Sequence, residues 1–280
     1  MPKDRSYPPA PESLPLPVVD NHTHIEPGQW PRPAKTLAEQ VKAASVVGVD
    51  RLVQCGCDLD SARWTVEQAV ANPAVLGAIA IHPNEAPRLL AGGTYSDALA
   101  QIHQWALTTD RIRAIGETGL DYYRTGPEGR DGQLEAFRDH ISLAKELGLA
   151  LQIHDREAHR DVVEVLLSVG APERTVFHCF SGDAELAGIC AANGWYCSFA
   201  GTLTYRSATN LQAAVRALPP SLLLLETDAP YLTPEPHRGR ANAPFLAPLT
   251  MRALAQWCQI DLVAACQQIS QNSQAVYGDW

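Results

Sequence analysis

Residues 75–81 read Val-Leu-Gly-Ala-Ile-Ala-Ile, a run without a single polar or charged side chain. A strand that faces water on one side alternates apolar and polar residues, whereas a strand of a parallel sheet is covered by helices on both faces. This run is therefore typical of a buried parallel strand. Similar short runs recur from about residue 16 onward, and most are followed by an amphipathic stretch. The pattern predicts an α/β fold.

The repeated units indicate how the sheet is arranged. The expected strands cover residues 16–20, 51–55, 75–81, 111–116, 149–153, 174–178, 195–199 and 222–226. The expected helices lie near residues 36–48, 61–71, 95–108, 131–147, 157–168, 183–193, 207–217 and 246–257. Eight such units in 280 residues favour a single (β/α)8 TIM barrel over an open, doubly wound sheet. The open sheet would need a glycine-rich phosphate turn after the first strand, where residues 21–24 read Asn-His-Thr-His.

Two proline-rich segments stand apart from this pattern. Residues 1–15 are predicted to form a loosely ordered N-terminal arm, which leaves residues 16–280 for the barrel. Residues 229–248 are predicted to form a stiff loop after the last strand, on the side of the active site. We expect a cytoplasmic protein without membrane contact, because no apolar run is long enough for a membrane span and residues 1–17 lack a signal-peptide core.

The net charge limits the class of substrate. The formal charge is −9 at pH 7, and non-specific binding along duplex DNA depends on many contacts between basic residues and phosphates. A nucleic-acid substrate should therefore be contacted locally, with bound cations supplying much of the attraction.

The cysteines indicate a reducing environment. They are seven in number and dispersed, which argues for free thiols rather than a disulfide framework. Cys55 and Cys57 are closely spaced, but no second pair completes a zinc cage. We expect both to be core or strand-end residues rather than ligands.

Metal-ligand residue types occur where the expected strands end. They are His22, His24, Glu117, His154, His178 and Asp228. The carboxyl ends of barrel strands meet at one face, so these side chains can build one metal site. For any single histidine of the set, a hydrogen-bonded place in the core is the commoner explanation. That explanation is hard to extend to four histidines and two acids at the same end of the barrel. The set predicts a metal-dependent hydrolase.

His22 and His24 share one face of their strand and can bind one cation, although two strand-end histidines without metal are the alternative. Asp20 is expected to orient one of these imidazoles. Glu117 lies between glycines and can bridge two cations, since no lysine ends an expected strand to serve as a carboxylated bridge. Asp228 can bind a cation and accept a proton from an attacking water, with Glu226 supporting the site or forming a structural salt link.

Several basic residues are candidates for substrate contacts. Arg156, Arg238 and Arg240 fall on the face that carries the ligand types, and guanidinium groups suit phosphate oxygens. A solvated surface arginine is the alternative in each case. His82 ends the third expected strand and is a further candidate, whereas His140 falls in a helix pattern and is expected to face solvent.

In these segments the chain resembles the TatD-type deoxyribonucleases, a branch of the metal-dependent hydrolase superfamily. The resemblance extends over about residues 17–277. The matching segments are Asp20-Asn21-His22-Thr23-His24, Ile81-His82-Pro83, residues 114–123, residues 153–158, residues 176–182, residues 226–234 and residues 238–242.

The resemblance implies a TIM barrel with a divalent metal site and hydrolysis of DNA phosphodiesters, often as an exonuclease. The implied ligands are His22, His24, Glu117, His154, His178 and Asp228. The chain departs from the family at residues 242–244, which read Asn-Ala-Pro where members commonly carry Asn-Glu-Pro. The role of that acid is absent at Ala243, which puts substrate positioning in question.

Our hypothesis is hydrolysis of DNA ends or single strands with two divalent cations, Mg²⁺, Mn²⁺ or Zn²⁺. One cation is assigned to His22 and His24 and the other to His154 and His178, and Glu117 bridges them. Asp228 is expected to act on the attacking water. Arg156 and Arg240 are expected to bind a flanking phosphate. No obligate protein partner is evident. The alternatives are a metal-dependent ester or amide hydrolase, such as an aminoacyl-tRNA deacylase, and a metal-binding scaffold without catalysis.

Overall fold

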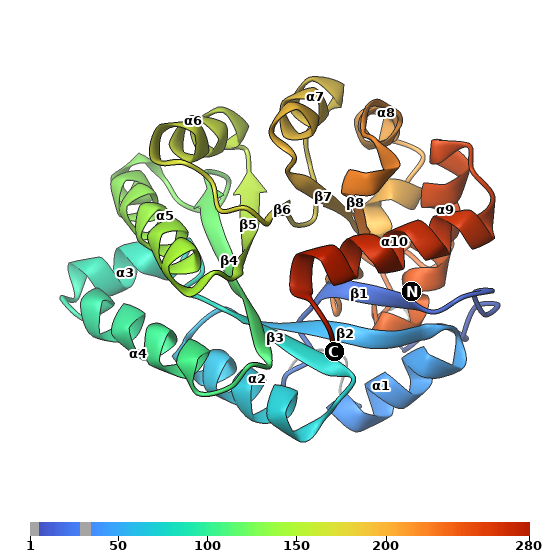
Figure 1. The fold of residues 1–280 in the computed structure, drawn as a ribbon, viewed down its shortest axis with the longest axis horizontal. Coiled ribbons are helices and arrows are strands. Elements are labelled where there is room, and N and C mark those ends of the chain that lie inside the picture. Colours follow the sequence, from blue (N-terminus) through green and yellow to red (C-terminus); the bar gives the residue numbers. More distant parts are fainter. Residues whose placement is uncertain (1–5, 29–34) are drawn as a thin grey trace, which may run out of the picture.

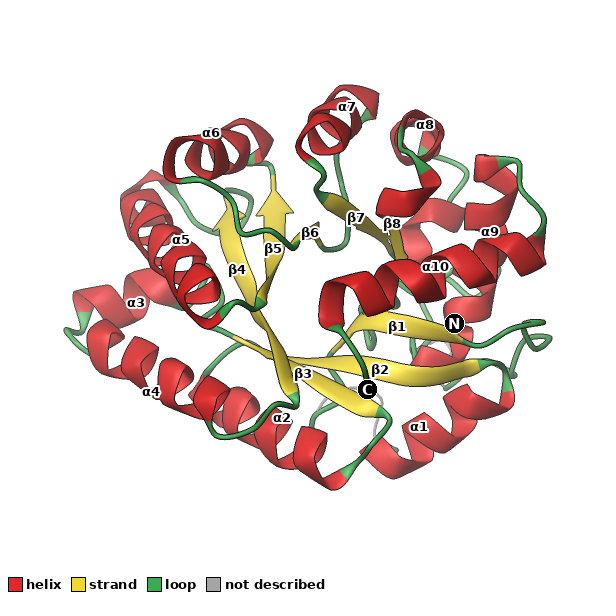
Figure 2. Ribbon diagram, viewed as in Figure 1, coloured by secondary structure: helices red, strands yellow, loops and turns green. Residues whose placement is uncertain are grey.

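The protein folds into the expected TIM barrel. The computed structural model describes residues 6–28 and 35–280, and within them eight parallel strands pair in the order β1 to β8. Figure 1 and Figure 2 show the strands as an inner ring with helices around it. The strands are β1 (Val18–Thr23), β2 (Val49–Gly56), β3 (Val75–Ile79), β4 (Ile112–Asp121), β5 (Ala150–Arg156), β6 (Thr175–Phe177), β7 (Tyr196–Phe199) and β8 (Leu223–Leu225).

All eight expected helices are present, with boundaries shifted by a few residues. They are α1 (Leu37–Val46), α2 (Leu59–Ala71), α4 (Tyr95–Leu107), α5 (Pro127–Leu147), α6 (His159–Val169), α7 (Ala184–Asn193), α8 (Thr209–Ala217) and α9 (Ala247–Cys258). Two further helices, α3 (Ala86–Ala91) and α10 (Leu262–Tyr277), were missed. The first has only six residues and a proline near its start, and the apolar residues of the second are interrupted by Gln and Ser.

The barrel is joined between β1 and the residues that follow β8. The backbone N–H of Asp228 donates to the carbonyl of His22 (3.0 Å), and that of His24 donates to the carbonyl of Ala229 (2.7 Å). The Asp20 carboxylate accepts from the backbone N–H of Thr227 (2.8 Å) and from its hydroxyl (2.5 Å). The closure therefore lies at the carboxyl ends of the strands, where it places Asp228 beside His22 and His24.

The barrel interior is a separate apolar layer, covered at its amino-terminal end by α10. Its inward side chains include Val53 and Cys55 of β2, with Val19, Leu76, Ala78, Ala114, Ala150, Val176 and Leu224. Asn272 of α10 donates to the carbonyls of Pro220 and Leu223, next to and at the start of β8. In Figure 1 α10 crosses in front of β1. Tyr277, near the end of α10, packs into the interior layer.

The described part of the N-terminal segment packs against the barrel. Of the expected arm, residues 6–15 are described, and residues 1–5 lie outside the described range. Leu14 is buried and its N–H donates to the carbonyl of Val47 (3.0 Å). The Tyr7 hydroxyl accepts from Gln40 (2.9 Å), and its ring lies 6.1 Å from that of Phe245. The apolar side chains between the prolines supply the contacts that the composition alone did not reveal.

None of the helices in residues 6–28 and 35–280 is both long and apolar enough to cross a membrane.

The helix pattern predicted that His140 faces solvent. In the structure it is instead fully buried between α5 and the barrel. Its Nδ1 lies 2.7 Å from the carbonyl of Ala136 and 3.0 Å from the hydroxyl of Thr118, and its Nε2 accepts from the backbone N–H of Ile81 (3.3 Å). Burial lowers the pKa of His140 from 6.5 to about 4. The neutral imidazole ties α5 to β4 and to the end of β3.

This burial predicts a loss of stability in acid. The pKa is lower in the folded state than in the unfolded state, so the contribution of His140 is complete above pH 6.5 and falls as the pH drops toward 4. We expect it to remove about 3 kcal/mol of unfolding free energy across that range. Urea unfolding of the metal-free protein at a series of pH values should show a shallower dependence for His140→Gln. Identical slopes in both proteins would contradict this assignment.

Candidate metal centre

The candidate ligands meet in one cavity at the carboxyl ends of the strands. The cavity has a volume of about 970 Å³. His24, Glu117, His154, His178 and Asp228 line it, and His22 lies beneath them, fully buried. The structure thus brings together all six residues that the sequence singled out, from β1 and the residue that follows it, from β4 and β5, and from the segments after β6 and β8.

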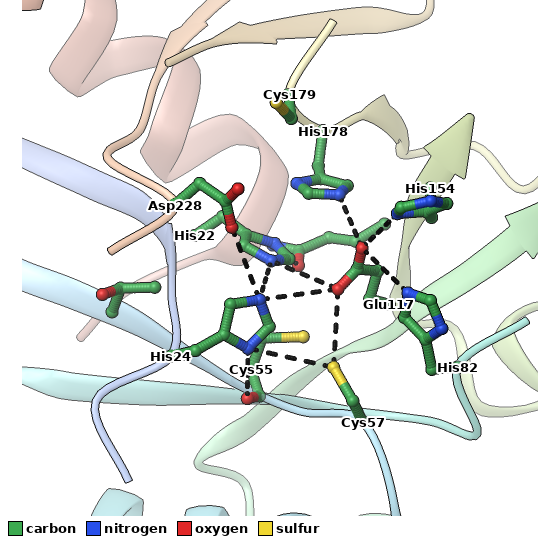
Figure 3. Close-up of polar contacts among 12 residues, drawn as sticks. His22, His24, Cys55, Cys57, His82, Glu117, His154, His178, Cys179 and Asp228 are labelled. Carbon is green, nitrogen blue, oxygen red and sulfur yellow. Dashed lines mark hydrogen bonds and ion pairs between the residues drawn. The ribbon is translucent and has the colours of Figure 1, made fainter. Parts of the chain in front are cut away.

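Glu117 lies at the centre of the group and within β4, which continues to Asp121 instead of ending before the glutamate (Figure 3). Its Oε1 contacts His154 Nδ1 and lies 2.8 Å from His178 Nε2. Its Oε2 lies 3.5 Å from His24 Nε2 and 3.7 Å from His22 Nε2. The two oxygens of one carboxylate therefore face two separate pairs of histidines.

Each of the four histidines turns its second ring nitrogen away from Glu117, toward a hydrogen-bond acceptor. His22 Nδ1 lies 2.9 Å from Gln152 Oε1, and His24 Nδ1 lies 3.1 Å from the carbonyl of Cys55. His178 Nδ1 faces Glu226 Oε1 at 3.3 Å, and His154 Nε2 faces Asp121 Oδ2 at 3.3 Å. Such outer acceptors are typical of metal-binding histidines, because they fix the tautomer and leave the inner nitrogen available as a ligand.

The prediction that Asp20 orients an imidazole is wrong. Its carboxylate is occupied by Thr227 at the barrel closure and approaches only the backbone N–H of His22 (3.5 Å). The acceptor for the ring is Gln152, whose amide also donates to the carbonyl of Asn21 (2.9 Å) and to the hydroxyl of Tyr277 (2.7 Å). A chain of hydrogen bonds therefore runs from α10 along the barrel interior to His22.

The charges of the site are strongly coupled. Burial alone would raise the pKa of Glu117, but His178, His82 and His154 outweigh it and hold the pKa well below its usual range. Burial, with the positive charge of His178 nearby, lowers the pKa of His22 to about 4. Burial raises the pKa of Asp228 to about 7, although the histidines oppose this. The shifts differ in sign because burial disfavours every charge, whereas the neighbouring imidazoles favour an ionised Glu117.

The donor set fits divalent cations. With Nδ1 of His22 and of His24 each donating outward, their Nε2 lone pairs face each other at 3.0 Å. Two nitrogens that bind one tetrahedral zinc ion at about 2.0 Å are separated by about 3.3 Å, so a shared cation suits this pair. The described residues form three such groups: His22 with His24, Cys55 and Glu117; His22 with His178 and Asp228; and His82 with Glu117 and His154.

Comparison with known proteins agrees with this geometry. Residues 19–278 match the sequence model of the family described as TatD related DNase. The chain belongs to the TatD family. It is therefore a metal-dependent hydrolase.

Individual TatD relatives cover most of the chain. An uncharacterized metal-dependent hydrolase from Mycobacterium tuberculosis, named TatD, is 43% identical over 245 residues, which cover 85% of this chain and 89% of that protein. The uncharacterized hydrolase YabD of Bacillus subtilis is 32% identical, covering 93% and 98%. The crystal structure of YjjV, a TatD homolog from Escherichia coli, has a TM-score of 0.84 at 23% identity, covering 93% and 97%, and supports the fold.

The predicted substrate contacts of this TatD protein are only partly in the cavity. His82 and Arg156 line it, and the Arg156 guanidinium stacks over the ring of Tyr123 at 4.0 Å. Arg240 does not line it, because its guanidinium donates to Ser6 Oγ and to the carbonyl of Tyr7, both at 2.8 Å. Its side chain is directed to the N-terminal segment, whose position could not be inferred from the loop sequence.

Arg238, the other arginine of the loop, stacks over Tyr205 at 4.3 Å. Ala243, which stands where TatD proteins commonly carry glutamate, is buried in the apolar core and does not line the cavity. Its N–H is bonded to Asn242 Oδ1 (2.9 Å). At this position the chain therefore presents no carboxylate to the cavity.

The roles of four residues of the site were not identified from the sequence. Gln152 and Asp121 are the outer acceptors for His22 and His154. Asn84 donates to Asp121 Oδ2 (3.0 Å), and Cys57 Sγ lies 3.4 Å from Glu117 Oε2. Gln152 is the one with a readable signal, since a polar residue in an apolar strand, two positions before His154, faces the same side of that strand.

Replacing Gln152 should weaken metal binding. In Gln152→Leu the Nδ1 of His22 loses its acceptor, so we expect the affinity for Zn²⁺ to fall by about 10- to 100-fold. Competition with a chromophoric chelator measures this directly. Gln40→Leu is the matched control, because Gln40 is also a buried glutamine but bonds Tyr7, away from the site. Equal affinities in the wild type and Gln152→Leu would show that Gln152 does not hold His22 in place.

Proposed function

We propose that this TatD-family hydrolase cleaves DNA phosphodiester bonds, as an exonuclease acting on ends or single strands, with two divalent cations. The observation that carries the proposal is the position of Glu117. One of its oxygens faces His22 and His24, and the other faces His154 and His178. A carboxylate between two pairs of imidazole nitrogens can be shared by two cations, and two-cation sites are a common means of phosphoryl transfer.

In the proposed site His22 and His24 hold one cation, His154 and His178 hold the other, and Glu117 is shared between them. Mg²⁺, Mn²⁺ and Zn²⁺ are the candidate ions, and the histidines favour Mn²⁺ and Zn²⁺ over Mg²⁺. When bound, the cations supply Lewis acidity, which activates water and offsets the negative charge that develops on the phosphoryl oxygens. The outer acceptors keep the four imidazoles oriented while this charge develops.

Asp228 is proposed as the group that takes the proton of the attacking water. Its Oδ1 lies 3.5 Å from His24 Nε2, and its side chain remains partly accessible from the cavity. Its backbone N–H is bonded to the carbonyl of His22, so its position relative to the two histidines of β1 is set by the barrel closure. A carboxylate held at this edge can orient a water and accept its proton.

Basic residues of the cavity wall favour a substrate that carries phosphate. Arg124 and Arg156 are exposed on its rim, and His82 lies deeper, 3.5 Å from Glu117 Oε1. The net charge of −9 disfavours long contacts with duplex DNA, so the substrate should be engaged over a few nucleotides. The family description as a DNase points the same way, whereas the similar proteins from Mycobacterium tuberculosis and Bacillus subtilis are named only as hydrolases.

The second candidate is hydrolysis of a carboxylic ester on a nucleotide or tRNA. The same activated water can attack a carbonyl carbon, and the rim arginines can hold the phosphate of such a substrate equally well. The cavity of about 970 Å³ accommodates either group. The two activities are distinguished by their substrates and not by the ligand set.

The direct test is metal-stripped protein with 5′-labelled single-stranded DNA and added Mg²⁺, Mn²⁺ or Zn²⁺. We expect ladder-like shortening that requires a cation and slows at least about 100-fold in Asp228→Asn, which cannot accept the proton. Asp58→Asn is the matched control, because Asp58 lines the same cavity but serves to cap α2 through Ser61. Metal content is measured for each variant, to separate loss of catalysis from loss of a ligand.

The result that overturns the proposal is intact DNA with every cation, from protein that has bound metal. An aminoacyl ester assayed in parallel then tests the second candidate. Turnover of the ester that is lost in Asp228→Asn would assign the site to ester hydrolysis.

A further inference from the structure

A sulfur atom lies against the histidine pair of β1. Cys55 is the last inward-facing residue of β2, two positions after Val53 in the inner layer of the barrel. It is fully buried. Its Sγ belongs to a group with one ligand atom each from His22, His24 and Glu117, all within 4.8 Å of one another. Figure 3 shows Cys55 beside His24, below the cluster.

The neighbouring cysteine has a different relation to the site. Cys57 Sγ lies 3.4 Å from Glu117 Oε2 and 3.8 Å from His24 Nδ1, which is the ring nitrogen that points away from the cluster (Figure 3). That nitrogen is already directed to the Cys55 carbonyl. Cys57 is therefore placed to donate its S–H to the Glu117 carboxylate and to orient it, whereas the Cys55 sulfur is the one grouped with ligand atoms of both His22 and His24.

We propose that Cys55 supplies a thiolate to the cation bound by His22, His24 and Glu117. This inference rests on the proposed metal site. It adds a sulfur ligand to the nitrogen and oxygen ligands of that site. Tetrahedral zinc takes nitrogen at about 2.0 Å and sulfur at about 2.3 Å, so the ligand atoms stand about 3.5 Å apart. The present group lies within 4.8 Å, so binding a cation would draw its ligand atoms together by about 1 Å.

A thiolate changes which ion this position takes. Sulfur ligands select Zn²⁺ and similar soft ions, while carboxylate-rich sites accept Mg²⁺ and Mn²⁺. At the second position, the histidines His154 and His178 have Asp121 and Glu226 as their outer acceptors. The ligand group that contains Cys55 includes neither of these histidines. The two cation positions are therefore chemically unequal, with one thiophilic ion on the β1 side. Binding at Cys55 breaks the S–H bond and releases one proton to solvent for each ion bound.

The test uses Co²⁺, which reports its ligands through its absorption spectrum. Metal-stripped protein is titrated with Co²⁺ and compared with Cys55→Ser and Cys57→Ser. The wild type is expected to show a sulfur-to-cobalt charge-transfer band in the near ultraviolet, together with visible bands of the bound ion. Cys55→Ser should lose the charge-transfer band, keep the visible bands and bind Zn²⁺ at least tenfold more weakly. Cys57→Ser is the matched control and should keep the charge-transfer band.

The outcomes separate this inference from the proposed site. Visible bands without a charge-transfer band in the wild type would show that Co²⁺ binds to the histidines without Cys55, which overturns the inference and leaves the metal site intact. A band that persists in Cys55→Ser, or that disappears in Cys57→Ser, overturns it as well. Failure of the wild type to bind Co²⁺ at all would overturn the metal site and the thiolate together. Circular dichroism of each variant confirms that the barrel is folded.

Discussion

The structure of the site depends on one buried carboxylate, that of Glu117, shared among imidazoles from several strands. An ionised group in a protein interior is strongly destabilising unless it is paired, and removing the partner of a buried charge costs about 3–5 kcal/mol. Glu117 meets this requirement by facing His24, His154 and His178 at once. The same arrangement that makes its burial tolerable directs imidazole nitrogens toward common points, which is what cation binding needs.

The scaffold is built so that this arrangement is held from two directions. On one side the Asp20 carboxylate and the His22 carbonyl bond Thr227 and Asp228, so the closure of the barrel and the shape of the site are the same set of contacts. On the other side Gln152 links the ring of His22 to Tyr277, at the opposite end of the barrel. Hydrogen bonds therefore hold His22 from both sides, which limits the reorganisation that binding a cation there would need.

The sequence predicted the parts of the molecule that depend on pattern. Parallel strands show as apolar runs, and because their carboxyl ends meet at one face, His154 and His178 could be placed together from separate segments. It did not predict contacts between elements that no local pattern connects. Arg240 is occupied by the N-terminal segment, and Asp20 bonds Thr227 instead of an imidazole. The role of Cys55 depends on the depth at which β2 ends relative to His24, which is a matter of register and not of composition.

In the proposed site Glu117 is shared by two cations, one at each pair of histidines. Anomalous scattering from crystals grown with Zn²⁺ tests it most directly, because it locates the ions independently of any activity. We expect two peaks about 3.5–4 Å apart, one beside His22 and His24 and the other beside His154 and His178, with a Glu117 oxygen on each. A single peak, or two peaks of which neither is in contact with Glu117, would contradict it.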